Sequence, residues 1–142
     1  MARTAAMTDR PMLFDAGIWI ASQDDEDRNY GPARELVLDA HLTTATLDLT
    51  LYEIANVVVR RWRDPVQATG LCRSAATRCW DHFATVDLDL VEATAEIALE
   101  HGLTSYDAAY VAAARRFDWQ LVSTDIRDLV SKGLAITPDA AV

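Results

Sequence analysis

Four acidic side chains lie beside apolar segments instead of among other charged residues. Asp15 ends the apolar run Met-Leu-Phe, and Glu53 lies within Leu-Tyr-Glu-Ile-Ala-Asn-Val. Asp107 lies in an alanine-rich segment, and Asp125 ends the run Leu-Val-Ser-Thr. A carboxylate beside a core segment is costly unless it is paired, hydrogen-bonded or bound to a cation. Several carboxylates in one place repel one another unless a metal ion compensates. Because such oxygen ligands suit Mg²⁺ or Mn²⁺, this set suggests divalent metal binding.

Each of these acids also has a purely structural interpretation. Asp107 comes three residues after a threonine, which is the spacing of a helix capping box. Asp125 can cap the segment that follows it, with Asp128 in the first turn. Asp15 can cap the next helix, and Glu53 can face solvent. Four such coincidences would have to arise independently, so we interpret the acids as one shared site.

The elements that must position these acids alternate between short strands and helices. Strands are expected at 12–14, 42–46, 84–88, 119–123 and, at an edge, 134–137. Helices are expected at 17–21, 32–40, 48–62, 65–83, 91–99, 104–117 and 126–131. This alternation predicts an α/β fold, a three-layer α/β/α sandwich with a short central parallel sheet. Sites in such sheets form outside the carboxyl ends of the strands, where Asp15 and Asp125 are expected.

The length of 142 residues fits one domain. We expect a flexible N-terminal tail at 1–11, the folded domain at 12–137 and a C-terminal tail at 138–142. No apolar run approaches the ~18 residues of a membrane span, so no membrane partner is expected. Cys72 and Cys79 would lie ~10 Å apart on one helix, too far for a disulfide. Free thiols of this kind are typical of the cytoplasm.

The charge is strongly acidic, with 13 basic and 22 acidic residues and a net charge of −9. This balance argues against unspecific binding to nucleic acid, which works by neutralising phosphates. Arginines nevertheless follow the candidate acids, among them Arg60, Arg115 and Arg127. Guanidinium groups bind phosphate bidentately. The same arginines also suit helix C-termini, where they complement the helix dipole, so both interpretations stay open.

Four segments together resemble the PIN-domain ribonucleases, and within them the VapC-like toxins of prokaryotic toxin–antitoxin pairs. The segments are Leu13-Phe14-Asp15, Leu51-Tyr-Glu53-Ile-Ala-Asn, Tyr106-Asp107-Ala-Ala-Tyr and Leu121-Val-Ser123-Thr124-Asp125. They occur in the order of the family pattern, and the resemblance covers about Met12 to Thr137. One position departs from the pattern: the family often has Ser, Thr or Asn two residues after the first Asp, where this chain has Gly17. The substitution removes a side chain that could orient a ligand.

The resemblance implies a PIN-like fold and an endoribonuclease that uses Mg²⁺ or Mn²⁺. The implied catalytic and metal-binding residues are Asp15, Glu53, Asp107 and Asp125. Residues implied around these ligands are Ser123, Thr124, Asp128 and Asn56, and the implied contacts to RNA phosphates are Arg60, Arg115 and Arg127. A metal-activated water would hydrolyse RNA to 5′-phosphate and 3′-hydroxyl ends. The implied partners are RNA, a cognate antitoxin and a second copy in a homodimer.

Other functions remain possible from the sequence alone. A catalytically weak or inactive PIN-like module that binds RNA or a partner is the main alternative, and Gly17 favours it. A phosphatase of the haloacid-dehalogenase type would need a second Asp at that same position. A receiver-type phosphorylation domain would need a lysine after a late strand, whereas Lys132, the only lysine, falls in a helix or loop.

Overall fold

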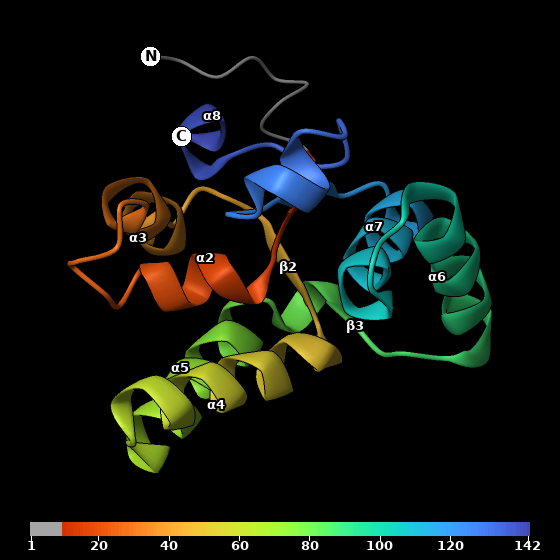
Figure 1. The fold of residues 1–142 in the computed structure, drawn as a ribbon. Helices are drawn as coiled ribbons and strands as arrows, with labels where there is room; N and C mark the ends of the chain where they lie inside the picture. Colours follow the sequence, from red (N-terminus) through yellow and green to blue (C-terminus); the bar gives the residue numbers. More distant parts are fainter. Residues whose placement is uncertain (1–9) are drawn as a thin grey trace.

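The computed structural model describes residues 10–142 and is drawn as a ribbon in Figure 1. Residues 1–9, most of the predicted N-terminal tail, lie outside the described residues. In the described part of the chain, four parallel strands form a short sheet in the order β3-β2-β1-β4. The strands are β1 (Met12–Phe14), β2 (Thr44–Leu47), β3 (Phe83–Ala84) and β4 (Gln120–Val122). The short central parallel sheet predicted from the sequence is therefore confirmed.

The edge strand predicted at 134–137 is reduced to a single bridge. Ile136 pairs with Val122 in parallel, and its backbone N–H donates to the carbonyl of Leu121 at 3.0 Å. Pro138 follows and begins a helix. Because proline has no N–H to donate to a ladder, the pairing stops there.

Helices connect the strands and cover the sheet. They are α2 (Ala16–Ala21), α3 (Tyr30–Leu38), α4 (Asp48–Trp62), α5 (Pro65–Arg78), α6 (Leu88–His101), α7 (Ser105–Phe117) and α8 (Pro138–Ala141), with a 3₁₀ turn η1 (Trp80–His82) and a π-type turn η2 (Ile126–Val130). The helix predicted at 65–83 begins as expected, because Asp64 accepts hydrogen bonds from the N–H groups of Val66 and Gln67. It ends earlier, and η1 follows. Within residues 10–142, every helix is too short or too polar to cross a membrane.

The helix predicted at 91–99 begins earlier, at Leu88. The carboxylate of Asp87 caps it by accepting a hydrogen bond from the N–H of Leu90 at 2.8 Å. The strand predicted at 84–88 is correspondingly shorter, because the cap takes over its last residues. The alternating pattern at 84–88 predicts a longer strand, but the hydrogen bond of the Asp87 cap starts a helix there.

Both ends of the described chain are packed against the domain. The segment after residue 137, which the sequence suggests is a tail, contains α8, whose Pro138 and Ala141 are buried. This helix packs against α3 near the C-terminus (Figure 1). At the other end, Arg10 donates to the side-chain oxygen of Gln120 in β4 at 3.1 Å. The folded unit therefore includes residues on both sides of the predicted boundaries 12–137.

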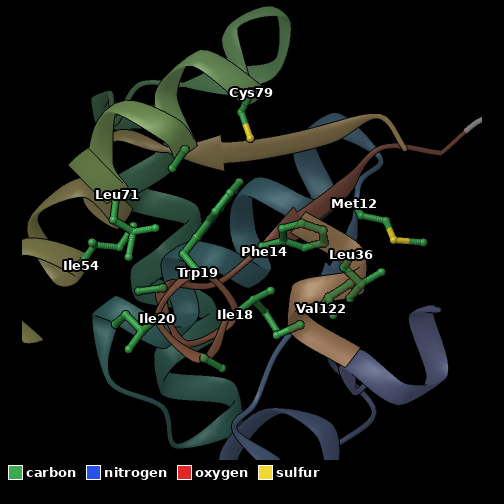
Figure 2. Close-up of a cluster of buried hydrophobic side chains, with 14 of the residues drawn as sticks. Met12, Phe14, Ile18, Trp19, Ile20, Leu36, Ile54, Leu71, Cys79 and Val122 are labelled. Carbon is green, nitrogen blue, oxygen red and sulfur yellow. The ribbon is translucent and has the colours of Figure 1, made fainter. Parts of the chain in front are cut away.

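Two apolar clusters lie on opposite faces of the sheet. Along β1, Met12 and Phe14 belong to one cluster and Leu13 to the other, as the alternation of a strand requires. The first cluster joins the sheet to α2, α3, α4 and α5, and Figure 2 shows Trp19 of α2 at its centre. The Phe14 and Trp19 rings meet edge to face with centroids 5.6 Å apart. The second cluster joins the sheet to α6 and α7. The three-layer α/β/α sandwich is confirmed.

The strand order places a topological switch point between β1 and β4. The chain moves outward from β1 to β2 and β3, and then returns to place β4 on the other side of β1. Connections leave β1 and β4 in opposite directions at their carboxyl ends, which is where open parallel sheets bind ligands. Asp15 follows β1, and Ser123, Thr124 and Asp125 follow β4. The fold therefore brings two of the four sequence segments to one place.

Candidate metal centre

Asp15 is a nearly buried carboxylate at the end of β1. Its Oδ1 accepts a hydrogen bond from the N–H of Ile18 at 3.2 Å and so caps α2, and its Oδ2 accepts one from the hydroxyl of Ser123. Burial raises the pKa of Asp15 from 3.8 to about 7, the hydrogen bond from Ser123 lowers it, and the charges of Glu53 and Asp107 raise it further. The ionised form of Asp15 is therefore costly unless a cation lies beside it.

Glu53 enters the same site from α4 and is held by a tyrosine of α7. The hydroxyl of Tyr110 donates to Oε1 of Glu53 at 2.5 Å and lies 2.9 Å from the hydroxyl of Thr50. Burial raises the pKa of Glu53, the hydrogen bond from Tyr110 lowers it, and the charge of Asp107 raises it. The half-buried side chain therefore points toward α7 and does not simply face solvent.

Three further carboxylates converge between α7 and η2. Oxygens of Asp107, Asp125 and Asp128 all lie within 4.8 Å of one another. Asp125 caps η2 by accepting from the N–H of Asp128 at 2.9 Å, and its own N–H donates to the hydroxyl of Ser123 at 2.9 Å. Asp107 lies in the first turn of α7, where its N–H donates to the hydroxyl of Thr104. The capping interactions expected from the sequence are present, and they orient the carboxylates of one cluster.

The charges of these groups are coupled across the site. Burial raises the pKa of Asp107, and the charges of Asp125 and Asp128 raise it further. Asp107 in turn raises the pKa of Asp15 and of Glu53, so it links the two halves of the site. Such mutual repulsion is relieved by a divalent cation.

The donor set fits a small, hard cation. Mg²⁺ binds oxygen at ~2.1 Å, so that ligands on opposite sides of the ion are ~4.2 Å apart. The separations within the Asp107, Asp125 and Asp128 cluster reach this range with small side-chain adjustments. All of these donors are carboxylate oxygens, which favour Mg²⁺ or Mn²⁺ over metals that prefer sulfur or nitrogen ligands.

The other residues predicted around the ligands are distributed unevenly. Ser123 is buried and bridges Asp15 to the backbone of Asp125. Thr124 is half-buried beside Gly17. Asn56 is exposed on α4, and no hydrogen bond joins it to the acids in the described structure.

The three predicted phosphate-binding arginines occupy different places. Arg127 lies at the edge of the cluster, where its Nε is 3.7 Å from a carboxylate oxygen of Asp128 and its side chain is 92% exposed. Arg60 is exposed, two turns along α4 from Glu53. Arg115 lies near the end of α7 and lines a cavity with residues at the start of β4. The structure therefore brings Arg127 to the site and places Arg115 at the opposite end of the sheet.

Tyr110 was not identified from the sequence. An aromatic residue in an alanine-rich helix indicates core, and Tyr110 is indeed only 2% exposed. The available signal was its position three residues after Asp107, which places both side chains on one face of α7. Asp128, which the sequence analysis placed around the ligands, lies in the carboxylate cluster itself.

We expect Tyr110→Phe to weaken the site more than the fold. The change leaves the hydroxyl of Thr50 and the carboxylate of Glu53 without their shared partner, so the free energy of unfolding should fall by ~1–2 kcal/mol. The affinity for Mn²⁺ should fall by about tenfold, because the tyrosine orients a candidate ligand. Urea unfolding and calorimetric Mn²⁺ titration measure the two effects. The control is Tyr106→Phe at an exposed position of the same helix; equal effects of both changes would contradict a role for the Tyr110 hydroxyl.

The chain belongs to the PIN-domain family, whose sequence profile matches residues 12–131. A curated relative is Ribonuclease VapC3 of Pyrobaculum aerophilum, which is 33% identical over 98 residues that span 66% of this chain and 74% of that protein. The resemblance that the four sequence segments indicated is thereby confirmed.

Solved structures share the fold at lower identity. A toxin–antitoxin complex from Klebsiella pneumoniae contains a chain with a TM-score of 0.68 and 23% identity, covering 89% of this chain and 97% of that one. VapC20 of Mycobacterium tuberculosis, described as a toxin that cleaves the sarcin–ricin loop, has a TM-score of 0.66 and 22% identity, covering 86% and 94%. These similarities establish the architecture around the candidate metal centre.

Proposed function

We propose that this chain is a metal-dependent endoribonuclease and the toxin of a type II toxin–antitoxin pair. The observation that carries the proposal is the cluster of Asp107, Asp125 and Asp128, whose oxygens lie within 4.8 Å of one another at the carboxyl end of β4, next to the strand that the buried Asp15 follows. The relationship to Ribonuclease VapC3 supports the same activity. The inactive binding module is less well supported, because Asp107 and Asp125 lie together with Asp128, and the charge of Asp107 acts on Asp15 and Glu53.

In this proposal the carboxylates bind the metal ion, and neighbouring side chains orient the carboxylates through hydrogen bonds. Asp15, Glu53, Asp107 and Asp125 would be the ligands of Mg²⁺ or Mn²⁺, with Asp128 as an additional one. A divalent cation held by these residues would supply activation of a water for attack on phosphorus and positive charge to offset the negative charge that develops there. Ser123 fixes the orientation of Asp15 by donating to its Oδ2. Water attack leaves 5′-phosphate and 3′-hydroxyl ends on the RNA.

Binding of RNA to an acidic protein requires local positive charge. Arg127 at the edge of the cluster and Arg60 on α4 are exposed and are the proposed phosphate contacts. Since the net charge of −9 opposes general attraction to RNA, we propose that recognition depends on RNA shape, as at single-stranded loops.

The partners and the compartment belong to the same proposal. We propose a cognate antitoxin, a homodimer and a cytoplasmic location for this chain. The toxin–antitoxin complex among the structural neighbours supports the first of these. The two free cysteines are compatible with a reducing compartment.

A chelation experiment tests the activity. We expect no cleavage of a mixed RNA substrate by protein treated with EDTA, and restored cleavage when Mg²⁺ or Mn²⁺ is added in excess. The new 5′ ends should be degraded by a 5′-phosphate-dependent exonuclease. Cleavage that persists in EDTA, or fragments with 2′,3′-cyclic phosphates, would contradict the proposed chemistry. RNA binding without cleavage under all metal conditions would instead favour the inactive module.

A further inference from the structure

Gly17 lies in the first turn of α2 without a conformational reason for glycine. The glycines with positive φ in the described chain are Gly102 and Gly133, and Gly17 is not among them. A glycine in a helix costs ~1 kcal/mol relative to alanine. Some other requirement must therefore exclude a side chain at this position.

The requirement is the close approach of Thr124. A Cβ atom added to Gly17 would overlap the hydroxyl oxygen of Thr124 and would lie 3.2 Å from Oδ1 of Asp15. The next nearest atom, the Cβ of Thr124, would be at an ordinary contact distance of 3.5 Å. The hydroxyl of Thr124 thus occupies the volume that a side chain at position 17 would fill, and the carboxylate of Asp15 borders the same volume.

Two consecutive hydroxyl groups therefore approach Asp15 from the end of β4. That of Ser123 is fully used, because it donates to Asp15 and accepts from the N–H of Asp125. Thr124 makes no hydrogen bond through its hydroxyl within residues 10–142, although the side chain is half-buried. A hydroxyl held in this position with no protein partner is free to bind water or a ligand beside Asp15.

We infer that Thr124 is a positioning residue that holds, against Asp15, a water from the hydration shell of the divalent ion. The inference rests on the proposed function. Mg²⁺ keeps several of its waters when it binds to proteins, and each of these waters needs hydrogen-bond partners. Gly17 leaves space for the hydroxyl of Thr124, because any larger residue at position 17 would displace that hydroxyl. Thr124, after β4, thus supplies the site with a hydroxyl that position 17 of α2, a glycine, does not supply.

The test measures Mn²⁺ binding by calorimetry, together with urea unfolding of the metal-free protein. Thr124→Val keeps the shape of the side chain and removes the hydroxyl, so the dissociation constant should rise by about 10–100-fold without a loss of stability. Thr124→Ser should retain the affinity of the parent protein. Gly17→Ala should weaken binding like Thr124→Val, because its Cβ takes the place of the hydroxyl.

A double variant that moves the hydroxyl from position 124 to position 17 separates loss of the hydroxyl from structural disturbance caused by a single substitution. Gly17→Ser combined with Thr124→Ala removes the overlap with the Thr124 hydroxyl, keeps the 3.2 Å contact with Oδ1 of Asp15, and returns a hydroxyl to this region from α2. This double variant should bind Mn²⁺ more tightly than Thr124→Ala alone. Unchanged binding by Thr124→Val, or no gain in the double variant, would overturn the inference.

Asp15→Asn, measured in parallel, separates this inference from the proposed function. If Asp15→Asn loses Mn²⁺ binding while Thr124→Val keeps it, only the role of Thr124 is wrong. If both variants bind as the parent does, the metal centre itself is wrong.

Discussion

Replacement of Asp15 by asparagine is expected to lower the rate of metal-dependent RNA cleavage by about 10²–10⁴-fold. Changes to residues that only support a metal ligand already cost 10–100-fold, and Asp15 would itself be a ligand. The amide keeps the shape of the carboxylate and can still accept a hydrogen bond from Ile18, so the fold should persist. The negative charge beside β1 and β4 is lost, and the amide nitrogen donates to the hydroxyl of Ser123 where the carboxylate accepted from it.

The control for this experiment is Asp81→Asn, the same chemical change at an exposed position of η1. It should cleave RNA at the rate of the parent protein, as measured with a fluorescent mixed-sequence RNA at saturating Mg²⁺. A rate for Asp15→Asn equal to that of Asp81→Asn would show that the buried carboxylate has no part in the chemistry.

The metal-free protein should become less stable as the pH rises from 4 to 8. Asp15 ionises near 3.8 in the unfolded chain and at about 7 in the folded one, so the folded state binds the extra proton between these values. The stability that this proton provides is fully present below 3.8 and is lost as the pH rises through about 7. A pKa difference of this size corresponds to roughly 4 kcal/mol. The raised pKa values of Glu53 and Asp107 act in the same direction.

Asp15→Asn isolates this contribution. In EDTA, the variant should be more stable than the parent by ~2–4 kcal/mol at pH 8, and the difference should shrink toward pH 4. Urea unfolding followed by tryptophan fluorescence across this pH range measures it. Addition of Mg²⁺ at pH 8 should stabilise the parent protein and have little effect on the variant, because only the parent protein is expected to bind the ion. A stability difference that does not depend on pH would rule out burial of a charge at Asp15 as its cause.

The layers of the fold and the main acids were accessible from the sequence for a simple physical reason. Short apolar runs that end in an acid, as at Asp15 and Asp125, combine a buried strand with a polar carboxyl end. Helical spacing of apolar residues then identified α4, which carries Glu53, and alanine-rich composition identified α7, which carries Asp107. These patterns involve residues close together in the sequence. They predict the correct element when the tertiary packing favours the same local structure.

The remaining features depend on contacts between distant residues. The hydrogen bond from Tyr110 to Glu53 joins α7 to α4, and the approach of Thr124 to Gly17 joins the end of β4 to α2. No sequence spacing reports either contact. The sequence shows that Gly17 departs from the family pattern, but it does not show that Thr124, 107 positions later, contacts Gly17.

The boundaries of elements were missed where a single hydrogen bond or packing contact decides them. The cap at Asp87 shortened β3, and burial of Ala141 against the first apolar cluster turned an expected tail into α8. Both effects act on a few residues at the end of a segment. Periodicity over a longer window does not detect changes of that size.

The position of β4 beside β1 determines when the candidate metal centre can first form. The first strand of the chain can pair with its neighbour β4 only after residue 122 has been synthesised, and the acids of η2 come later still. Because chains emerge from the ribosome N-terminal end first, a nascent chain that stops before this point lacks Asp125 and Asp128. In the proposed function, a chain that stops before η2 therefore cannot form the candidate metal centre.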